Sequence, residues 1–184
     1  MQRVRYPRRR FIQNIAAAAV GASVLPACSR QTGSWRFLTD AEALLVDAIS
    51  EQIIPTDQDP GAIQAGVTNF IDRQLVGVHQ RYQQSYRTGL IGIQETSQAM
   101  FNSPFEQLAW NDQTAVLKAL ESGKAQGTTW RDRSSRAFFE LIRDHTQQGF
   151  YGSPRHGGNR DYISYRMLQL DYPQIVSQNR YRKL

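Results

Sequence analysis

The spacing of apolar residues after residue 38 constrains the fold most, because they recur three and four positions apart in one segment after another. The first such segment begins at Asp40 and ends before Pro55, since proline cannot continue a helix. Thr39-Asp40-Ala41-Glu42 at its start has the form of a capping box, in which two side chains satisfy free backbone N–H groups. No stretch alternates between apolar and polar residues as a half-buried strand does. The sequence therefore predicts an all-α protein.

The same spacing predicts four more helices, over residues 67–76, about 79–101, 113–121 and 130–145. The second of these contains Gly89 and Gly92, each of which costs about 1 kcal/mol relative to alanine unless a neighbour packs closely there. Asn111-Asp112 is expected to cap the third. We therefore expect a single compact multi-helix domain.

The connection from Pro55 to Gly66 is rich in turn-forming residues. Asp57 and Asp59 are separated by a single residue, as acidic ligands are in a calcium-binding loop. The glycine and glutamate that complete an EF-hand are missing. We interpret both aspartates as turn and capping residues.

The first 27 residues have the features of an export signal. Arg8-Arg9-Arg10-Phe11-Ile12-Gln13, followed by an apolar run from Ile15 to Leu25, resembles a twin-arginine signal, with Arg8, Arg9, Phe11 and Ile12 at the recognised positions. The apolar run is shorter than the roughly 20 residues that a membrane-spanning helix needs. We therefore expect residues 1–27 to direct the folded protein across a bacterial membrane to the periplasm and to be cleaved there.

Leu25-Pro26-Ala27-Cys28, at the end of the apolar run, resembles a lipobox. Two interpretations stay open. In one, Cys28 is acylated and becomes the first residue of a membrane-associated lipoprotein; several acyl chains then give durable anchoring where one would not. In the other, ordinary cleavage after Ala27 leaves Cys28 as a spare thiol.

Most of the net positive charge of the chain lies in this leader. Five of the 22 lysines and arginines precede Cys28 and no acid does, which leaves 17 basic and 16 acidic residues in the remainder. A nucleic-acid-binding domain keeps a basic stripe in its folded part, so we expect no nucleic-acid partner. We divide the remainder into a tether (residues 28–37), a helical domain (38–175) and a basic tail (176–184).

Few residues of the types used in catalysis or metal binding are grouped in the sequence. Cys28 is the only cysteine, which excludes an intrachain disulfide, iron–sulfur ligation and CxxCH haem attachment. His79, His145 and His156 are far apart, and we interpret His145 as a surface or capping residue near a helix C-terminus. No phosphate-binding or nucleophile motif is present. The sequence thus predicts no catalytic, cofactor-binding or metal-binding residues in this chain.

The segment Gly149–Asn159, GFYGSPRHGGN, is unusual because it joins four glycines to aromatic and basic residues. Glycine allows close backbone approach, and Tyr, Phe and Arg are types found at interface hot spots. A surface turn held by its own aromatic rings fits the composition equally well. As an interface, it would use Phe150, Tyr151, Arg155, His156, Gly157, Gly158 and Asn159, with the two rings as exposed anchors.

Residues 38–173 resemble one known family. The matching motifs are Leu38-Thr39, Ile53-Ile54-Pro55-Thr56, Pro60-Gly61-Ala62, Ala65-Gly66-Val67, Phe70-Ile71-Asp72 and, most specific, Gly149-Phe150-Tyr151-Gly152-x-Pro154-x-x-Gly157-Gly158-Asn159. On these residues the chain resembles gluconate 2-dehydrogenase subunit 3, the small subunit of membrane-associated flavin-dependent sugar and polyol dehydrogenases.

The resemblance implies a non-catalytic accessory subunit of an oxidoreductase acting on CH–OH donors. It implies FAD in a large partner subunit, haem c in a multihaem cytochrome c subunit, and a leader that carries the large subunit through the twin-arginine translocase. Two alternatives stay open from the residues alone: an exported lipoprotein binding module, and an autonomous haem or metal protein in which the three histidines meet.

Overall fold

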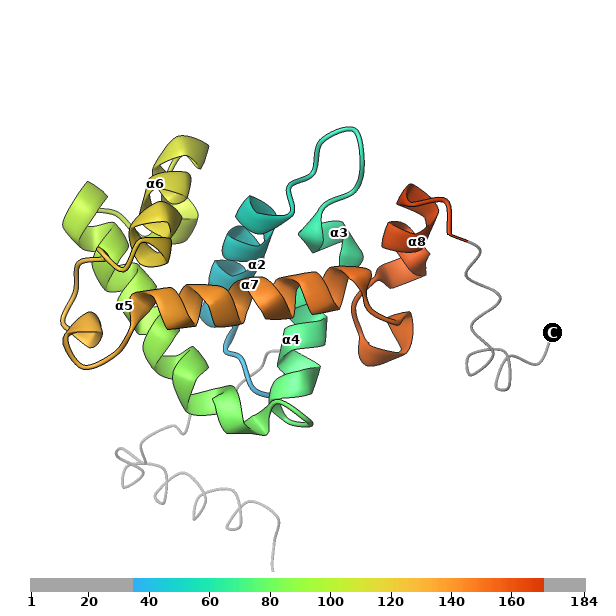
Figure 1. The fold of residues 1–184 in the computed structure, drawn as a ribbon, viewed down its shortest axis with the longest axis horizontal. Helices are drawn as coiled ribbons and strands as arrows, with labels where there is room; N and C mark the ends of the chain where they lie inside the picture. The colour runs from blue at the N-terminus through green and yellow to red at the C-terminus, as the bar shows by residue number, and fades with distance from the viewer. Residues whose placement is uncertain (1–34, 171–184) are drawn as a thin grey trace, which may run out of the picture. The chain divides into compact units, whose positions relative to one another are not determined.

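A computed structural model describes residues 35–170, and within this range every regular element is a helix (Figure 1). The predicted all-α fold class is confirmed. The α-helices are α2 (Asp40–Ile53), α3 (Ala62–Ala65), α4 (Val67–Leu75), α5 (Gln83–Phe101), α6 (Trp110–Glu121), α7 (Ser135–Tyr151) and α8 (Ile163–Met167). Short 3-10 helices join them: η1 (Gln80–Tyr82), η2 (Phe105–Gln107), η3 (Thr129–Arg131), η4 (Pro154–His156) and η5 (Arg160–Tyr162).

Helix α2 begins at the predicted capping box. The Thr39 hydroxyl accepts a hydrogen bond from the Glu42 N–H at 3.2 Å, and the Glu42 carboxylate accepts one from the Thr39 N–H at 2.8 Å. The predicted turn role is also confirmed for Asp57 in the next connection, since its carboxylate accepts a hydrogen bond from the Asp59 N–H at 2.9 Å.

The buried carboxylate of Asp72 on α4 fixes the segment that precedes α2. It accepts hydrogen bonds from three consecutive backbone N–H groups, those of Arg36, Phe37 and Leu38, at 2.8, 2.8 and 3.0 Å. Arg87 on α5 holds the same segment, because it donates to the Phe37 carbonyl and lies 4.0 Å from the centre of the Phe37 ring. Arg36 and Phe37, which the sequence assigned to the tether, are therefore held against the domain.

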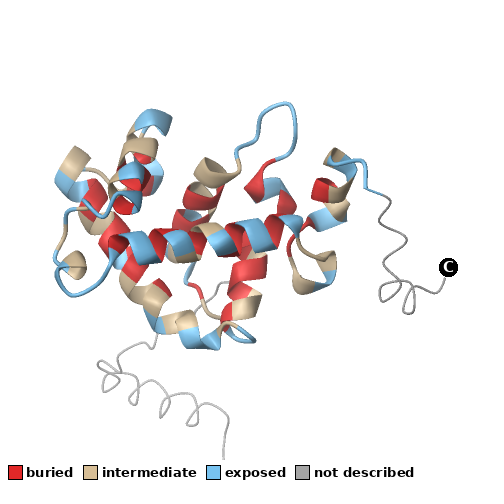
Figure 2. Ribbon diagram, viewed as in Figure 1, coloured by how far each residue is buried: buried red, intermediate tan, exposed pale blue. Residues whose placement is uncertain are grey.

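Helix α7 lies across the middle of the described domain and packs against α2, α4, α5 and α6 (Figure 1). One side of it is buried along its whole length, whereas the opposite side faces solvent (Figure 2). Its buried residues are Ser135, Phe138, Phe139, Ile142, His145, Thr146, Gly149 and Phe150. The hydrophobic core is thus organised around α7.

Two glycines allow α5 to approach its neighbours closely. A Cβ atom on Gly89 would lie 2.3 Å from the Phe138 ring of α7, and one on Gly92 would lie 2.3 Å from the Trp130 ring of η3. A neighbour therefore packs closely at both glycines, which is the condition under which their cost to the helix can be offset. Helix α5 begins at Gln83, and η1 occupies part of the preceding segment that was predicted as helix.

Two predicted helix starts are wrong. Helix α6 begins at Trp110, before the predicted Asn111-Asp112 cap, and η2 leads into it. Helix α7 begins at Ser135 rather than at Trp130, because the Ser134 hydroxyl accepts a hydrogen bond from the Ala137 N–H and caps it there. The Trp130 indole N–H instead donates to the Thr96 hydroxyl of α5, so this residue serves a tertiary contact.

Candidate functional site

The segment Gly149–Asn159 does not begin as the loop predicted from sequence. Helix α7 continues through Gly149 and Phe150 and ends at Tyr151 rather than at His145. The chain then turns at Gly152 and forms η4 before it reaches Asn159. The helix can continue here because Gly149 has no side chain to collide with α4: a Cβ atom at this position would lie 3.0 Å from the Phe70 ring.

The other glycines of the segment serve contacts within the domain. A Cβ atom on Gly158 would lie 2.1 Å from the carbonyl oxygen of Gly149, so the returning chain lies directly against the end of α7. Gly157 has a φ of +104°, in the region that favours glycine, and its carbonyl accepts a hydrogen bond from Asn69 of α4 at 2.7 Å. These glycines hold the segment against α4 and α7.

Asn159 is fully buried, which contradicts its predicted role as a partner contact. Its amide nitrogen donates to the Gly152 carbonyl at 2.8 Å, and its amide oxygen accepts from the Ser164 N–H at the start of α8 at 3.0 Å. Both ends of the side chain are thus engaged inside the domain. Asn159 links the end of α7 to α8.

The two adjacent aromatic residues have different environments. Phe150 is fully buried in the hydrophobic core, so its assignment as an exposed anchor was wrong. Tyr151 is exposed, and its ring lies edge-on to that of Phe150, with the centroids 4.9 Å apart. Successive helical residues point about 100° apart, and this rotation places one ring inside and the other outside.

The basic part of the segment lies at the surface. Arg155 is exposed, and its Nε atom donates to the Nε2 atom of His156 at 3.0 Å. Gln74 of α4 donates to the His156 carbonyl at 3.3 Å, which fixes η4 to the end of α4. Burial and then the charges of Arg155 and Arg73 lower the pKa of His156.

Sequence analysis did not predict a cluster of stacked rings beneath η1. His145 is buried in α7 rather than exposed at a helix end, and its Nδ1 atom lies 2.9 Å from the Tyr86 hydroxyl. The rings of His79 and His145 stack with centroids 4.2 Å apart. His79 Nε2 lies 3.2 Å from the Gln148 amide oxygen, and His79 Nδ1 is buried without a hydrogen-bond partner among residues 35–170.

The protonation of this cluster follows from its burial. Burial raises the pKa of Tyr86, so its hydroxyl keeps the proton. In the neutral His145 tautomer that carries its proton on Nε2, this hydroxyl donates a hydrogen bond to Nδ1. Burial and then the neighbouring His79 lower the pKa of His145 to about 4. Asp144 opposes this shift, and Arg81 adds to it. His145 is therefore a neutral, hydrogen-bonded core residue near pH 7.

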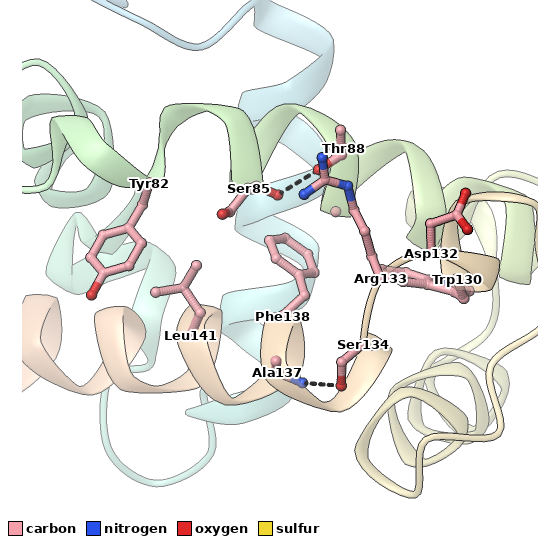
Figure 3. A pocket seen from close by; sticks show the side chains of 11 residues that line it. Tyr82, Ser85, Thr88, Trp130, Asp132, Arg133, Ser134, Ala137, Phe138 and Leu141 are labelled. Atoms are coloured by element: carbon pink, nitrogen blue, oxygen red, sulfur yellow. Dashed lines mark hydrogen bonds between the residues drawn. The ribbon is translucent and has the colours of Figure 1, made fainter.

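A groove of about 480 Å³ lies between α5 and the start of α7 (Figure 3). Phe138, Leu141 and Gly89 give it an apolar lining, and Ser85, Thr88 and Ser134 add hydroxyl groups. Figure 3 shows the Arg133 side chain directed from the segment before α7 toward α5. The groove combines an apolar lining with several hydroxyl groups, the Arg133 guanidinium and the Asp132 carboxylate.

The chain was compared with known families, curated proteins and solved structures. Residues 40–171 match the family described as gluconate 2-dehydrogenase subunit 3. The chain belongs to this family. Neither the curated proteins nor the solved structures gave a match. Family membership groups the chain with a subunit of a gluconate 2-dehydrogenase, an oxidoreductase, and it confirms the resemblance identified from the sequence motifs.

The earlier motifs of the subunit 3 family also have structural roles. Asp72 fixes the segment before α2. A Cβ atom on Gly61 would lie 2.5 Å from the Thr56 backbone nitrogen, so a side chain there would separate the two ends of the connection before α3. Gly66 has a φ of +71° and forms the joint between α3 and α4. These motifs therefore define how the helices are connected.

Within residues 35–170, no group of three or more His, Cys, Asp or Glu residues could hold a metal ion. His79 and His145 meet, but His156 lies in η4 against Arg155 and does not join them. None of the helices that the structure describes is long and apolar enough to cross a membrane. The predicted export residues Arg8, Arg9, Phe11 and Ile12, and the predicted lipidation site Cys28, lie outside the described residues.

Proposed function

We propose that this chain is the non-catalytic accessory subunit of a periplasmic, membrane-bound, FAD-dependent dehydrogenase that oxidises a sugar, a sugar acid or a polyol. FAD would lie in the large partner subunit and haem c in a cytochrome subunit. The match of residues 40–171 to the gluconate 2-dehydrogenase subunit 3 family carries this proposal.

The contacts of the closing motif support a stabilising rather than a catalytic role. The Asn159 amide bonds to Gly152 and Ser164, and the Gly157 carbonyl bonds to Asn69. His145, whose imidazole is the most deeply buried of those described, is hydrogen-bonded to the Tyr86 hydroxyl. The polar groups of the most distinctive motif are thus used to hold the helices together.

The leader supports a second part of the role, which is export of the partner. Arg8-Arg9-x-Phe11-Ile12 resembles a signal that is read only after folding. Bound to a folded flavin subunit, the chain would carry the whole complex through the twin-arginine translocase with one signal.

Changing both arginines of the signal tests the export role. In a host that produces this chain with its flavin subunit, Arg8→Lys together with Arg9→Lys should leave the flavin subunit in the cytoplasm, because both proteins depend on one signal. Flavin fluorescence and dye-linked dehydrogenase activity in the periplasmic fraction measure this. The matched control is Arg3→Lys with Arg5→Lys, which changes two leader arginines outside the motif and should leave export normal. Normal periplasmic flavin in the Arg8/Arg9 variant would contradict the escort role.

The non-catalytic role is tested on the purified complex and on the purified chain. A tagged chain isolated from its own host should bring with it a flavin-containing subunit, recognised by its absorbance, and dehydrogenase activity should follow that subunit. Stoichiometric flavin, or turnover, in the chain alone would contradict the assignment.

A further inference from the structure

We infer that the chain contacts its flavin subunit through the surface formed by the α4–η1 turn, the end of α7 and η4, and that the complementary surface of the partner is acidic with an apolar centre. This surface, here called the turn surface, consists of Val76, Val78, Gln148, Tyr151 and Arg155. The inference rests on the proposed function and adds to it the place of contact and the chemistry of the partner.

Three apolar side chains of the turn surface face solvent. Val78 is 75% exposed, and Val76 and Tyr151 are each 45% exposed. Val76 and Val78 are two residues apart in a short turn, so neither can be covered by its own helix. Val76 and Val78 thus make an exposed apolar pair in one turn, and such a pair marks an interaction surface more often than an isolated exposed side chain does.

Hydrogen bonds join the separate parts of this surface. His79, which follows Val78, bonds to Gln148 of α7. Tyr151 comes three residues after Gln148 and therefore leaves α7 on the same side. Gln74, near the end of α4, bonds to the carbonyl of His156, the neighbour of Arg155. These bonds tie the turn to the end of α7, and the end of α4 to η4.

The charged groups around the turn surface are predominantly positive. Arg81 lies over Tyr82 at 4.8 Å, and Arg73 lies against Gly157. Arg73 comes three residues before Val76, Arg81 comes three residues after Val78, and Arg155 lies in η4, so the segments that form this surface carry three guanidinium groups. The nearby carboxylate of Asp144 is already paired with Arg143 at 3.2 Å. A partner surface that carries carboxylates around an apolar centre complements this arrangement.

Two other exposed apolar residues, Leu44 and Ile63, have a different electrostatic setting. Leu44, on α2, has Asp40 and Asp47 at the neighbouring helical positions. Ile63 donates its backbone N–H to the carboxylate of Glu51. The turn surface differs from both because its apolar side chains are accompanied by arginines, and this is why we assign the acidic partner to it.

The support beneath the turn surface favours binding without rearrangement. The His79 ring stacks on His145, and Asn69 and Arg73 pack against Gly157. The surface is therefore held in place by the core before the partner arrives. Binding to a preformed surface loses less conformational entropy than binding that must order a loop.

Measured affinities of single variants test the inference. The full-length chain and its flavin subunit are purified, and the dissociation constant is measured for the unchanged chain and for Val78→Asp, Arg155→Glu and Ile91→Asp. Ile91, which is 57% exposed on α5, is the matched control for the valine. Val78→Asp should weaken binding at least about thirtyfold, as expected for an interface anchor. Arg155→Glu should weaken it about tenfold at low salt and less at high salt, and Ile91→Asp should change it less than threefold.

The outcomes separate the docking surface from the proposed function. If the unchanged chain binds and both Val78→Asp and Arg155→Glu bind equally well, the turn surface is not the interface. If Arg133→Glu in the groove between α5 and α7 weakens binding while these two do not, the partner binds in the groove instead. If the unchanged chain binds no flavin subunit at all, the proposed function fails, and the docking surface fails with it. Equal melting temperatures exclude misfolding, and Arg155→Glu remains informative if Val78→Asp does not fold.

Discussion

His145 shows how one buried side chain connects three elements. Its ring lies between those of His79 and Tyr86, with centroid distances of 4.2 and 5.7 Å, and so joins α7 to the turn before η1 and to α5. The ring is neutral near pH 7, because burial and the neighbouring His79 lower the pKa of His145. Protonation would place a charge in the core and remove the acceptor that Tyr86 uses.

We predict that this residue makes the protein sensitive to acid. The pKa of His145 is about 4 in the folded protein and 6.5 ordinarily, so between these values the unfolded chain binds a proton here that the folded protein does not. The free energy of unfolding should therefore fall as pH falls from 6.5 to 4, by up to about 3 kcal/mol. Urea unfolding measured across this range checks it.

The control for the acid effect is a comparison of two substitutions. His145→Gln keeps an acceptor for Tyr86 but cannot be protonated, so it should flatten the pH dependence. His156→Gln, at the surface in η4, should change it much less. An unchanged pH dependence in His145→Gln would contradict the assignment.

At the residue scale, the sequence showed which residue types are grouped together but not which of them are buried. Phe150 and Tyr151 look equivalent in the sequence, and the glycines around them suggested a loop. Continuing the helical spacing from Ile142 through Thr146 would have placed Phe150 on the buried side. The burial of His145 had no comparable signal, because Tyr86 and His79 approach it only in the folded chain.

At the element scale, the start of α2 was predictable from local sequence, whereas features that depend on tertiary contacts were not. The start of α2 depends on Thr39 and Glu42, which are three residues apart, and it was predicted correctly. The start of α7 depends on Ser134 as well as on Trp130 being held against Gly92 of α5. The second contact joins distant parts of the chain and leaves no local pattern in the sequence.

The contact between the end of α7 and the returning chain yields a prediction for the elements that it joins. Gly158→Ala should destabilise the protein by about 2 kcal/mol, as overpacking does, because a Cβ atom there would lie 2.1 Å from the Gly149 carbonyl oxygen. Thermal unfolding of the purified protein measures it.

Gly77→Ala is the matched control for this substitution. A Cβ atom on Gly77 would lie 3.4 Å from the nearest atom, the Arg73 carbonyl oxygen, which is an ordinary contact. Gly77→Ala should change the free energy of unfolding by no more than about 0.5 kcal/mol. If both alanines have the same small effect, the close approach of Gly158 to α7 does not stabilise the fold.

At the scale of the whole molecule, the proposed complex needs a membrane anchor whose nature can be tested. The residues from Cys28 onward carry 17 basic and 16 acidic side chains, so no large positive excess attracts anionic lipid. No helix within residues 35–170 could span a bilayer. In the proposed complex, the anchor is either an acylated Cys28 or a bound partner subunit. Asp72 holds Arg36 and Phe37, which come eight and nine residues after that cysteine.

We predict that acylation of Cys28 is the anchor, and replacing the cysteine tests this. Cys28→Ser removes the thiol that would take the lipid, so the mature protein should move from the membrane to the soluble periplasmic fraction. Mass spectrometry of the unchanged protein should show a mature N-terminus at Cys28 with added acyl mass. Carbonate washing distinguishes the two sources, since it releases a protein held by a partner but not one held by several acyl chains. If Cys28→Ser stays in the membrane and the unchanged protein is washed off, a partner subunit holds the complex there, and Cys28 is the spare thiol left by cleavage after Ala27.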